Sequence, residues 1–314
     1  MTNQTFQFDF EVAVREKAKL RMAIDGPAKS GKTFTSLLIA TYLVPDGKII
    51  MLDTEHNSGL KYAPVPGTAA TPDEGTFNFL HANLPDYSPA AYIAGIHAAE
   101  EAGADVIVVD SFTHAWKNIL EQKNSLDLRG VNGDKRYANS WTNWGFLTVQ
   151  QEELIETVLQ SSCHIIATMR SKMAYEQIKD DQTNKLKVVK LGLEPIQREG
   201  TEYEFDVMLD MNQEHFGTIS GTRCHELEGY GALNPGQEVA EILGAWLQTG
   251  VEPAERPMRR EVFVAQMGAL GYVDDAQIKG ILGELKLLSI SGPRKYNVML
   301  EAVMRHVEET KSHE

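Results

Sequence analysis

The stretch Gly26-Pro-Ala-Lys-Ser-Gly31-Lys32-Thr33 limits the possible folds more than any other part of this 314-residue sequence. It matches the pattern G-x-x-x-x-G-K-[S/T], follows the apolar run 19–24, and precedes helical spacing over 33–43. In a strand–loop–helix context the glycines let backbone N–H groups surround phosphate oxygens, and the helix N-terminus adds partial positive charge. The alternative is a chance glycine-rich turn. We expect a nucleotide to be held by Gly26, Pro27, Ala28, Lys29, Ser30, Gly31, Lys32, Thr33 and Phe34.

Three side chains are expected to balance the negative charge of the phosphates at this loop. Lys32 would place its ammonium at the β- and γ-phosphates, and the Thr33 hydroxyl would bind a magnesium ion. Asp110 follows the apolar run 105–109, a position that holds magnesium in P-loop enzymes. The alternative for Asp110 is that its carboxylate caps the next helix. The expected cofactors are therefore ATP and Mg²⁺, with Thr33 and Asp110 at the metal.

Apolar runs of strand length alternate with segments of helical spacing along the first 250 residues. Near-continuous apolar strands are typical of a parallel sheet that is covered by helices on both faces. The expected fold class is therefore α/β with a mostly parallel sheet. Such strands are expected at 19–24, 48–52, 105–109 and 164–168, a short one at 76–80, and antiparallel edge strands at 204–210 and 217–222. Loops are expected at 117–140 and 171–200.

Four segments are expected along the chain. An N-terminal arm covers 1–18, a core covers 19–248, a linker with two prolines covers 249–257, and a small helical domain covers 258–314. Asp274 and Asp275 suit the start of a helix in the last segment. Two roles stay open for this domain. It could bind DNA or a partner, or it could serve only as a small helical cap.

Composition restricts the classes of partner and compartment. The net charge of −14 opposes any protein that coats nucleic acid through bulk electrostatic attraction. No apolar run is long enough to span a membrane, and the N-terminus lacks the features of a signal peptide. The two cysteines, Cys163 and Cys224, fit no metal-site spacing. A cytoplasmic protein with reduced thiols is expected.

The acidic segment after the run 48–52 resembles the RecA family. There Asp53-Thr-Glu55-His56 matches an Asp-x-Glu-His stretch that ends the corresponding strand and carries a catalytic glutamate. The resemblance implies that Glu55 positions the water that attacks ATP, and Asp53 is expected to fix the loop. It also implies that polar residues at the end of the strand 164–168, here Thr168 and Arg170, sense the γ-phosphate. The alternative for Glu55 is a solvent-facing loop.

Several segments together resemble a phage-encoded family, the RecA-like members of the phage Sak group of single-strand annealing and recombination proteins. The resemblance covers about residues 19–248. It implies a RecA-type P-loop NTPase core that hydrolyses ATP at the interfaces of a homo-oligomer, either a ring or a filament. It also implies single-stranded DNA and a single-strand-binding protein as partners, in the cytoplasm of a bacterial host. The segments are 24–27, 109–116, 163–172, 192–200, 202–206 and 222–224.

The resemblance also suggests a residue that acts between subunits and two loops that contact DNA. Relatives often have Lys-Thr-Arg where this chain has Gly221-Thr222-Arg223, so only Arg223 remains to reach a neighbour's γ-phosphate. The alternative for Arg223 is an ion pair with a surface carboxylate. The two DNA-contacting loops correspond to about 113–144 and 171–200. Trp141 and Trp144 in the first could equally be core, and the lysine run 179–190 in the second could be a solvated hairpin. The candidate DNA-binding residues are Lys135, Arg136, Lys185, Lys187 and Lys190.

Two other classes of function stay open. One is a phage helicase loader or motor-like ATPase, for which DNA is secondary. The other is a nucleotide-gated binding module with little turnover. The acidic net charge and the lysine missing before Thr222 favour these alternatives to some degree.

Overall fold

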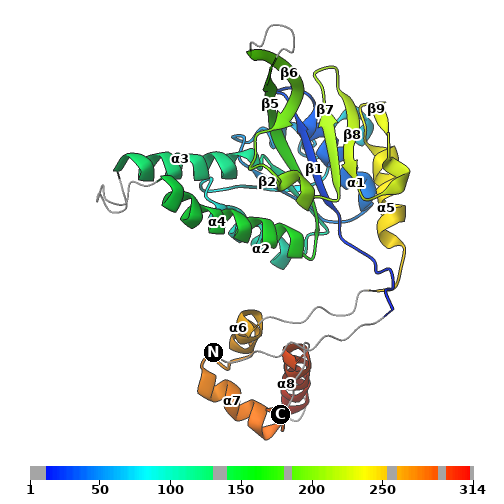
Figure 1. The fold of residues 1–314 in the computed structure, drawn as a ribbon. Helices are drawn as coiled ribbons and strands as arrows, with labels where there is room; N and C mark the ends of the chain where they lie inside the picture. The colour runs from blue at the N-terminus through cyan, green and yellow to red at the C-terminus, as the bar shows by residue number, and fades with distance from the viewer. Residues whose placement is uncertain (1–11, 130–139, 180–185, 253–259, 289–294, 312–314) are drawn as a thin grey trace. The chain divides into compact units, whose positions relative to one another are not determined.

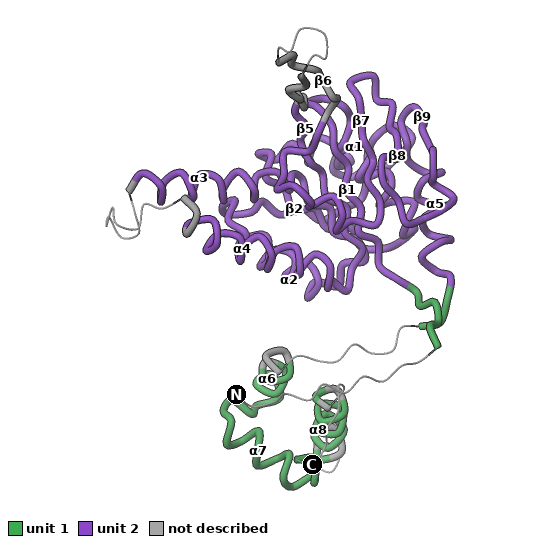
Figure 2. Tube along the Cα trace, in the orientation of Figure 1, with its two compact units in different colours: residues 1–17, 250–314 green, residues 18–249 purple. Residues whose placement is uncertain are grey.

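The computed structural model describes residues 12–129, 140–179, 186–252, 260–288 and 295–311. Contacts divide the chain into two units, residues 18–249 and residues 1–17 with 250–314 (Figure 2). Within the described ranges, no helix is long and apolar enough to cross a membrane.

The larger unit is built on a nine-stranded sheet of the described residues (Figure 1). Its strand order is β3-β2-β4-β5-β1-β7-β8-β9, and β6 pairs with β5. The pairs from β3 through to β7 are parallel, whereas β7–β8, β8–β9 and β5–β6 are antiparallel. The strands are β1 Arg21–Gly26, β2 Ile49–Asp53, β3 Leu80–Asn83, β4 Val106–Asp110, β5 His164–Lys179, β6 Leu186–Pro195, β7 Val207–Met211, β8 Phe216–Thr222 and β9 Gly231–Leu233.

Helices cover both faces of this sheet, as Figure 1 shows. One face packs against α1 and α5, and the other packs against α2, α3 and α4. Alternate residues of each central strand enter opposite cores, so Met22 and Ile24 lie in one and Ala23 lies in the other. The helices are α1 Lys32–Leu43, α2 Pro89–Glu101, α3 Thr113–Arg129, α4 Ser140–Gln160 and α5 Gln237–Gln248. The expected α/β class with a mostly parallel sheet is confirmed.

Three local expectations were wrong. The segment predicted as a loop over 117–140 contains most of α3, because buried Ala115 and Ile119 give a narrow apolar stripe beside otherwise polar residues. The strand expected at 76–80 overlaps β3 only at Leu80. The loop expected at 171–200 is largely a hairpin, in which β5 continues to Lys179 and pairs with β6. Polar composition hid both the helix and the hairpin.

Within its described residues, the smaller unit contains three helices around a core of its own. The helices are α6 Arg260–Ala269, α7 Asp275–Glu284 and α8 Lys295–Lys311. Asp274 caps α7 by accepting a hydrogen bond from the Gln277 N–H, at 2.8 Å, as the sequence predicted. Phe263 and Tyr296 stack with ring centroids 5.0 Å apart. These C-terminal helices are therefore present as expected.

Candidate functional site

The glycine-rich loop joins β1 to α1, and its geometry requires two of its glycines. Gly26 ends β1, and a Cβ atom there would lie 2.5 Å from the Met211 carbonyl oxygen. Gly31 precedes α1 with a left-handed φ of 91°, which glycine adopts without steric cost. The chain can therefore turn sharply into α1, whose first N–H groups have no partner within the helix and are available to an anion.

Lys32 is the first residue of α1, and its side chain folds back over the loop. Its Nζ donates hydrogen bonds to the carbonyl oxygens of Gly26, at 2.9 Å, and Pro27, at 2.7 Å. Burial lowers the pKa of Lys32, while the nearby carboxylates of Asp110 and Glu55 act to raise it. The ammonium is thus placed where phosphate oxygens could replace backbone carbonyls as its acceptors.

Asp110 ends β4 and is buried beneath the same loop. Its Oδ2 accepts a hydrogen bond from Thr33 Oγ1 at 2.7 Å, and its Oδ1 accepts one from Thr168 Oγ1 at 2.5 Å. Burial raises the pKa of Asp110, and these two hydroxyl groups oppose that shift. Asp110 therefore does not simply cap the next helix, since both carboxylate oxygens face β5 and the loop. Thr168, predicted to sense a phosphate, is fully buried and holds this carboxylate.

The neighbouring oxygens of Thr33 and Asp110 fit the requirements of a magnesium ion. Magnesium prefers hard oxygen ligands and keeps several waters or phosphate oxygens, so one hydroxyl and one carboxylate suffice. A dedicated protein cage would need more ligands. In the described part of the chain, no group of three or more His, Cys, Asp or Glu residues could hold a metal.

Asp53 fixes the loop that follows β2, as expected. Its carboxylate is buried and accepts hydrogen bonds from the backbone N–H groups of Glu55, at 2.5 Å, and Gly59, at 3.1 Å. The His81 ring nitrogen Nε2 lies 3.0 Å from the same carboxylate. These bonds hold the backbone of Glu55 in place without using its side chain.

The Glu55 side chain forms an ion pair with Arg170. Its Oε1 accepts hydrogen bonds from Arg170 Nε, at 3.0 Å, and Nη2, at 2.6 Å. Arg170 is paired with Gly26 in the β1–β5 register, so this pair lies at the start of the phosphate loop. The alternative of a fully solvent-facing Glu55 does not hold, because its side chain is only 27% exposed.

The other predicted loop residues differ in their surroundings. Ser30 is buried, whereas Ala28 and Lys29 are exposed. Phe34 packs edge-on against Phe77 with ring centroids 5.5 Å apart, so its side chain belongs to the core rather than to the open part of the site.

Arg223 and the candidate DNA-binding residues are not gathered at the loop. Arg223 follows β8, and its Nη1 lies 3.0 Å from Asp206 Oδ1 within the same chain, which is the ion pair considered as its alternative. Its side chain remains 61% exposed. Lys187 and Lys190 belong to β6 by backbone register, but their side chains lie outside the described part. Three candidates fall wholly outside the described residues, namely Lys135, Arg136 and Lys185.

An acidic pair beside the loop, formed by buried Asp25 and exposed Asp210, was missed by the sequence analysis. Asp25 immediately precedes Gly26, is 2% exposed, and is paired with Asp210 in the β1–β7 register. Ser171 Oγ donates a hydrogen bond of 2.6 Å to Asp25 Oδ2. Burial, together with Asp210, raises the pKa of Asp25 to about 7. The available signal was an aspartate directly before the glycine-rich motif.

The chain matches a known protein family over most of its length. A family model described as an AAA domain matches residues 18–235. Among solved structures, the KaiC-like protein PH0186 from Pyrococcus horikoshii OT3 is similar, with 13% sequence identity and a TM-score of 0.34. That match covers 70% of this chain and 94% of the other. No curated protein matches the chain. Since the family match spans well over half of the chain and includes the whole site, the chain belongs to the AAA domain family of P-loop ATPases.

Proposed function

We propose that the chain binds ATP together with Mg²⁺ and hydrolyses the γ-phosphate bond. The observation that carries the proposal is the contact between Thr33 Oγ1 and Asp110 Oδ2, 2.7 Å, directly beneath a phosphate loop. This contact joins a hydroxyl from the start of α1 to a carboxylate from the end of β4. When bound, magnesium would neutralise phosphate charge there, with Thr33 and Asp110 contributing oxygens.

The remaining side chains have separate roles in this proposal. Lys32 exchanges the carbonyl oxygens of Gly26 and Pro27 for phosphate oxygens, so its charge moves onto the β- and γ-phosphates. Glu55 orients a water molecule and accepts its proton as the oxygen attacks phosphorus. Thr168 keeps the Asp110 carboxylate in place through its hydroxyl.

Arg170 would regulate when Glu55 is available. Its guanidinium now binds Glu55, and a γ-phosphate at the loop would offer it a more highly charged acceptor. Transfer of the guanidinium to the phosphate would release the Glu55 carboxylate for the water. The same residue would thereby sense the triphosphate and free the base.

The test is phosphate release by the full-length protein with ATP and Mg²⁺, compared with Lys32→Ala and Glu55→Gln. We expect turnover in the wild type, loss of ATP binding in Lys32→Ala, and retained binding without turnover in Glu55→Gln. Wild-type protein that binds ATP tightly without turning it over would instead indicate a nucleotide-gated binding module. Equal turnover in all three proteins would reject the proposed site.

We further propose that the ATPase acts on single-stranded DNA as a homo-oligomer in recombination or annealing. Support comes from the sequence resemblance, and from the β5–β6 hairpin that begins at Ser171, directly after Arg170. The net charge of −14 opposes this proposal. Turnover measured with and without single-stranded DNA tests it, because stimulation by DNA is expected. Turnover that is indifferent to DNA would favour the loader or motor-like alternative.

A further inference from the structure

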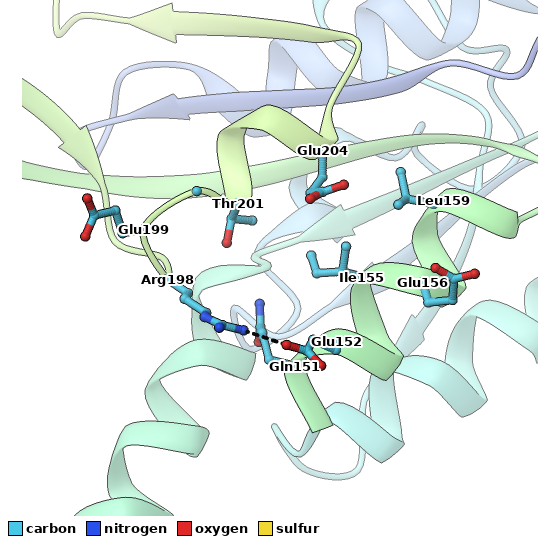
Figure 3. A pocket seen from close by; sticks show the side chains of 10 residues that line it. Gln151, Glu152, Ile155, Glu156, Leu159, Arg198, Glu199, Thr201 and Glu204 are labelled. Atoms are coloured by element: carbon cyan, nitrogen blue, oxygen red, sulfur yellow. Dashed lines mark hydrogen bonds and ion pairs between the residues drawn. The ribbon is translucent and has the colours of Figure 1, made fainter. Parts of the chain in front are cut away.

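A second cavity, apart from the phosphate loop, lies between α4 and the segment 198–204 (Figure 3). Its volume is about 420 Å³, and no phosphate-loop residue is among the described residues that line it. One wall is a single face of α4, and the other wall belongs to the turn that precedes β7. This size is sufficient for a few side chains of a ligand.

The cavity is strongly acidic. The described residues that line it supply four carboxylates and a single guanidinium, that of Arg198. Arg198 Nη1 lies 3.5 Å from Glu152 Oε1, a long contact that Figure 3 shows across the cavity. Because the acidic groups are in excess, a phosphate backbone would be repelled and ammonium or guanidinium groups would be attracted. The four carboxylates are those of Glu152, Glu156, Glu199 and Glu204.

A buried amide in the same cavity has no partner among the described residues. Gln151 is 2% exposed, and neither its Oε1 nor its Nε2 forms a hydrogen bond with the protein. Figure 3 places this side chain among the groups that line the cavity. A buried polar group without a partner is unfavourable, so the site is incomplete without a group that both donates and accepts. A peptide backbone unit has that property, whereas a polyamine has no acceptor.

An apolar cavity of about 600 Å³ continues from the acidic one and shares Arg198 and Glu199 with it. Trp116 and Trp144 line it and stack with ring centroids 5.8 Å apart. The nearby Lys123 ammonium is neutralised by Asp127 at 2.6 Å, so it does not repel a cation strongly. This cavity suits an apolar side chain.

Together the two cavities form what we call the α4 groove, whose α4 wall runs from Trp144 to Leu159. With a rise of roughly 1.5 Å per residue, this part of α4 is about 22 Å long. An extended peptide of about seven residues covers that distance. The groove thus combines an apolar end, a buried amide and an acidic end, at the length of a short peptide.

We propose that the α4 groove binds a basic segment of a partner protein. Its arginine or lysine side chains pair with Glu199 and Glu204, one of its backbone units bonds to the Gln151 amide, and an apolar side chain packs on Trp116 and Trp144. The proposal does not depend on nucleotide hydrolysis. It assigns this face of the chain to a basic peptide and not to nucleic acid.

The test uses the full-length protein and a fluorescein-labelled heptapeptide, Arg-Ala-Arg-Leu-Arg-Ala-Arg, followed by fluorescence anisotropy. We expect saturable one-to-one binding that weakens about tenfold or more in Glu199→Gln/Glu204→Gln. Both carboxylates are exposed, and no bond of either one holds the fold in the described residues. The matched control is Glu101→Gln/Glu214→Gln, which removes the same charge from exposed positions outside the groove and should bind as the wild type does. Equal loss in both double variants would show bulk charge attraction and overturn the proposal.

A second variant separates the groove from its charge. Gln151→Met keeps a similar volume and removes the unpaired amide, so it should fold at least as stably as the wild type but bind the peptide more weakly. Spermine binding as tightly as the peptide, with no effect of Gln151→Met, would overturn the peptide assignment. Self-association that disappears in Glu199→Gln/Glu204→Gln, measured by sedimentation equilibrium, would assign the groove to a second copy and overturn the partner assignment.

Discussion

Arg170 holds the carboxylate of Glu55 through two hydrogen bonds to one oxygen, of 3.0 Å from Nε and 2.6 Å from Nη2. The residues are 115 apart in the chain: Glu55 follows the end of β2, whereas Arg170 lies within β5, opposite Gly26. With 39% and 27% of their side chains exposed, the pair is accessible to a ligand that enters the phosphate loop. It therefore connects recognition of a triphosphate to the group proposed to activate water.

Replacing Arg170 by alanine should weaken binding of ATP more than binding of ADP. A hydrogen bond to a charged group contributes about 1.5–3 kcal/mol, and the bond to Glu55 lost from the free protein offsets part of it. We therefore expect a roughly tenfold loss of ATP affinity and little change for ADP, measured by titration with fluorescent nucleotide analogues.

The control for this variant is Arg198→Ala, because Arg198 is similarly exposed and also ion-paired, but lies away from the loop. It should leave both nucleotide affinities unchanged. An equal loss of ATP and ADP affinity in Arg170→Ala would mean that Arg170 shapes the loop and does not sense the γ-phosphate.

Glu55→Gln should slow hydrolysis about 10²- to 10⁴-fold, the usual contribution of a general base. The amide retains the shape and can still bond to Arg170 through its oxygen, so ATP affinity should change little. Single-turnover phosphate release measures the chemical step, and Glu101→Gln is the matched control. A variant that hydrolyses at the wild-type rate would remove Glu55 from the mechanism.

The phosphate loop and Asp110 could be predicted because each is a local pattern joined to a strand of clear apolar character. Gly26 to Thr33 carry the backbone requirements within eight consecutive positions, and Asp110 ends five buried residues of β4. The parallel sheet then brings the two together, since the carboxyl ends of its strands lie at one edge. The fold class followed from the same apolar runs.

The pairings across the sheet could not be predicted in this way. Arg170 meets Glu55 only because β4 lies between β2 and β5, and Asp25 meets Asp210 only because β1 pairs with β7 in a particular register. No periodicity in the sequence predicts which strands are neighbours or in which register they pair. Helix α3 was missed for a different reason, because its stability depends on packing against α4 rather than on a broad apolar face.

Thr33→Val should raise the magnesium concentration needed for half-maximal hydrolysis. Valine keeps the branched shape but removes the hydroxyl that lies 2.7 Å from Asp110 Oδ2. We expect a shift of about tenfold, the equivalent of one hydrogen bond to a charged group. Hydrolysis measured across a magnesium titration at saturating ATP tests this expectation.

Thr168→Val serves as the comparison, because it removes the other hydroxyl on Asp110 without removing a proposed metal ligand. It should lower the free energy of unfolding by about 1–2 kcal/mol, with a smaller change in magnesium dependence. Identical magnesium curves for Thr33→Val and wild type would exclude Thr33 as a ligand.

Asp25→Asn should remove a pH dependence of stability that the wild type shows between about pH 4 and pH 7. The pKa of Asp25 is raised from 3.8 to about 7 in the folded protein, so the folded state holds a proton that the unfolded state releases. The stabilisation is complete below the unfolded pKa, falls as the pH rises through this window, and is lost above about 7. Asparagine stays neutral, accepts a hydrogen bond from Ser171, and can donate one to Asp210. The variant should therefore be the more stable protein at pH 8, by an amount on the order of a few kcal/mol.

Urea unfolding at pH 5 and pH 8 measures the free energy of unfolding of the wild type and of Asp25→Asn. The difference between the two proteins at each pH cancels the contributions of the other titrating groups. Asp46→Asn, at an exposed turn, should follow the wild-type curve. If the stability of Asp25→Asn also follows the wild-type pH curve, the carboxyl of Asp25 is ionised in the folded protein throughout this range. The negative charge of the acidic pair beside the phosphate loop must then be balanced by Lys32.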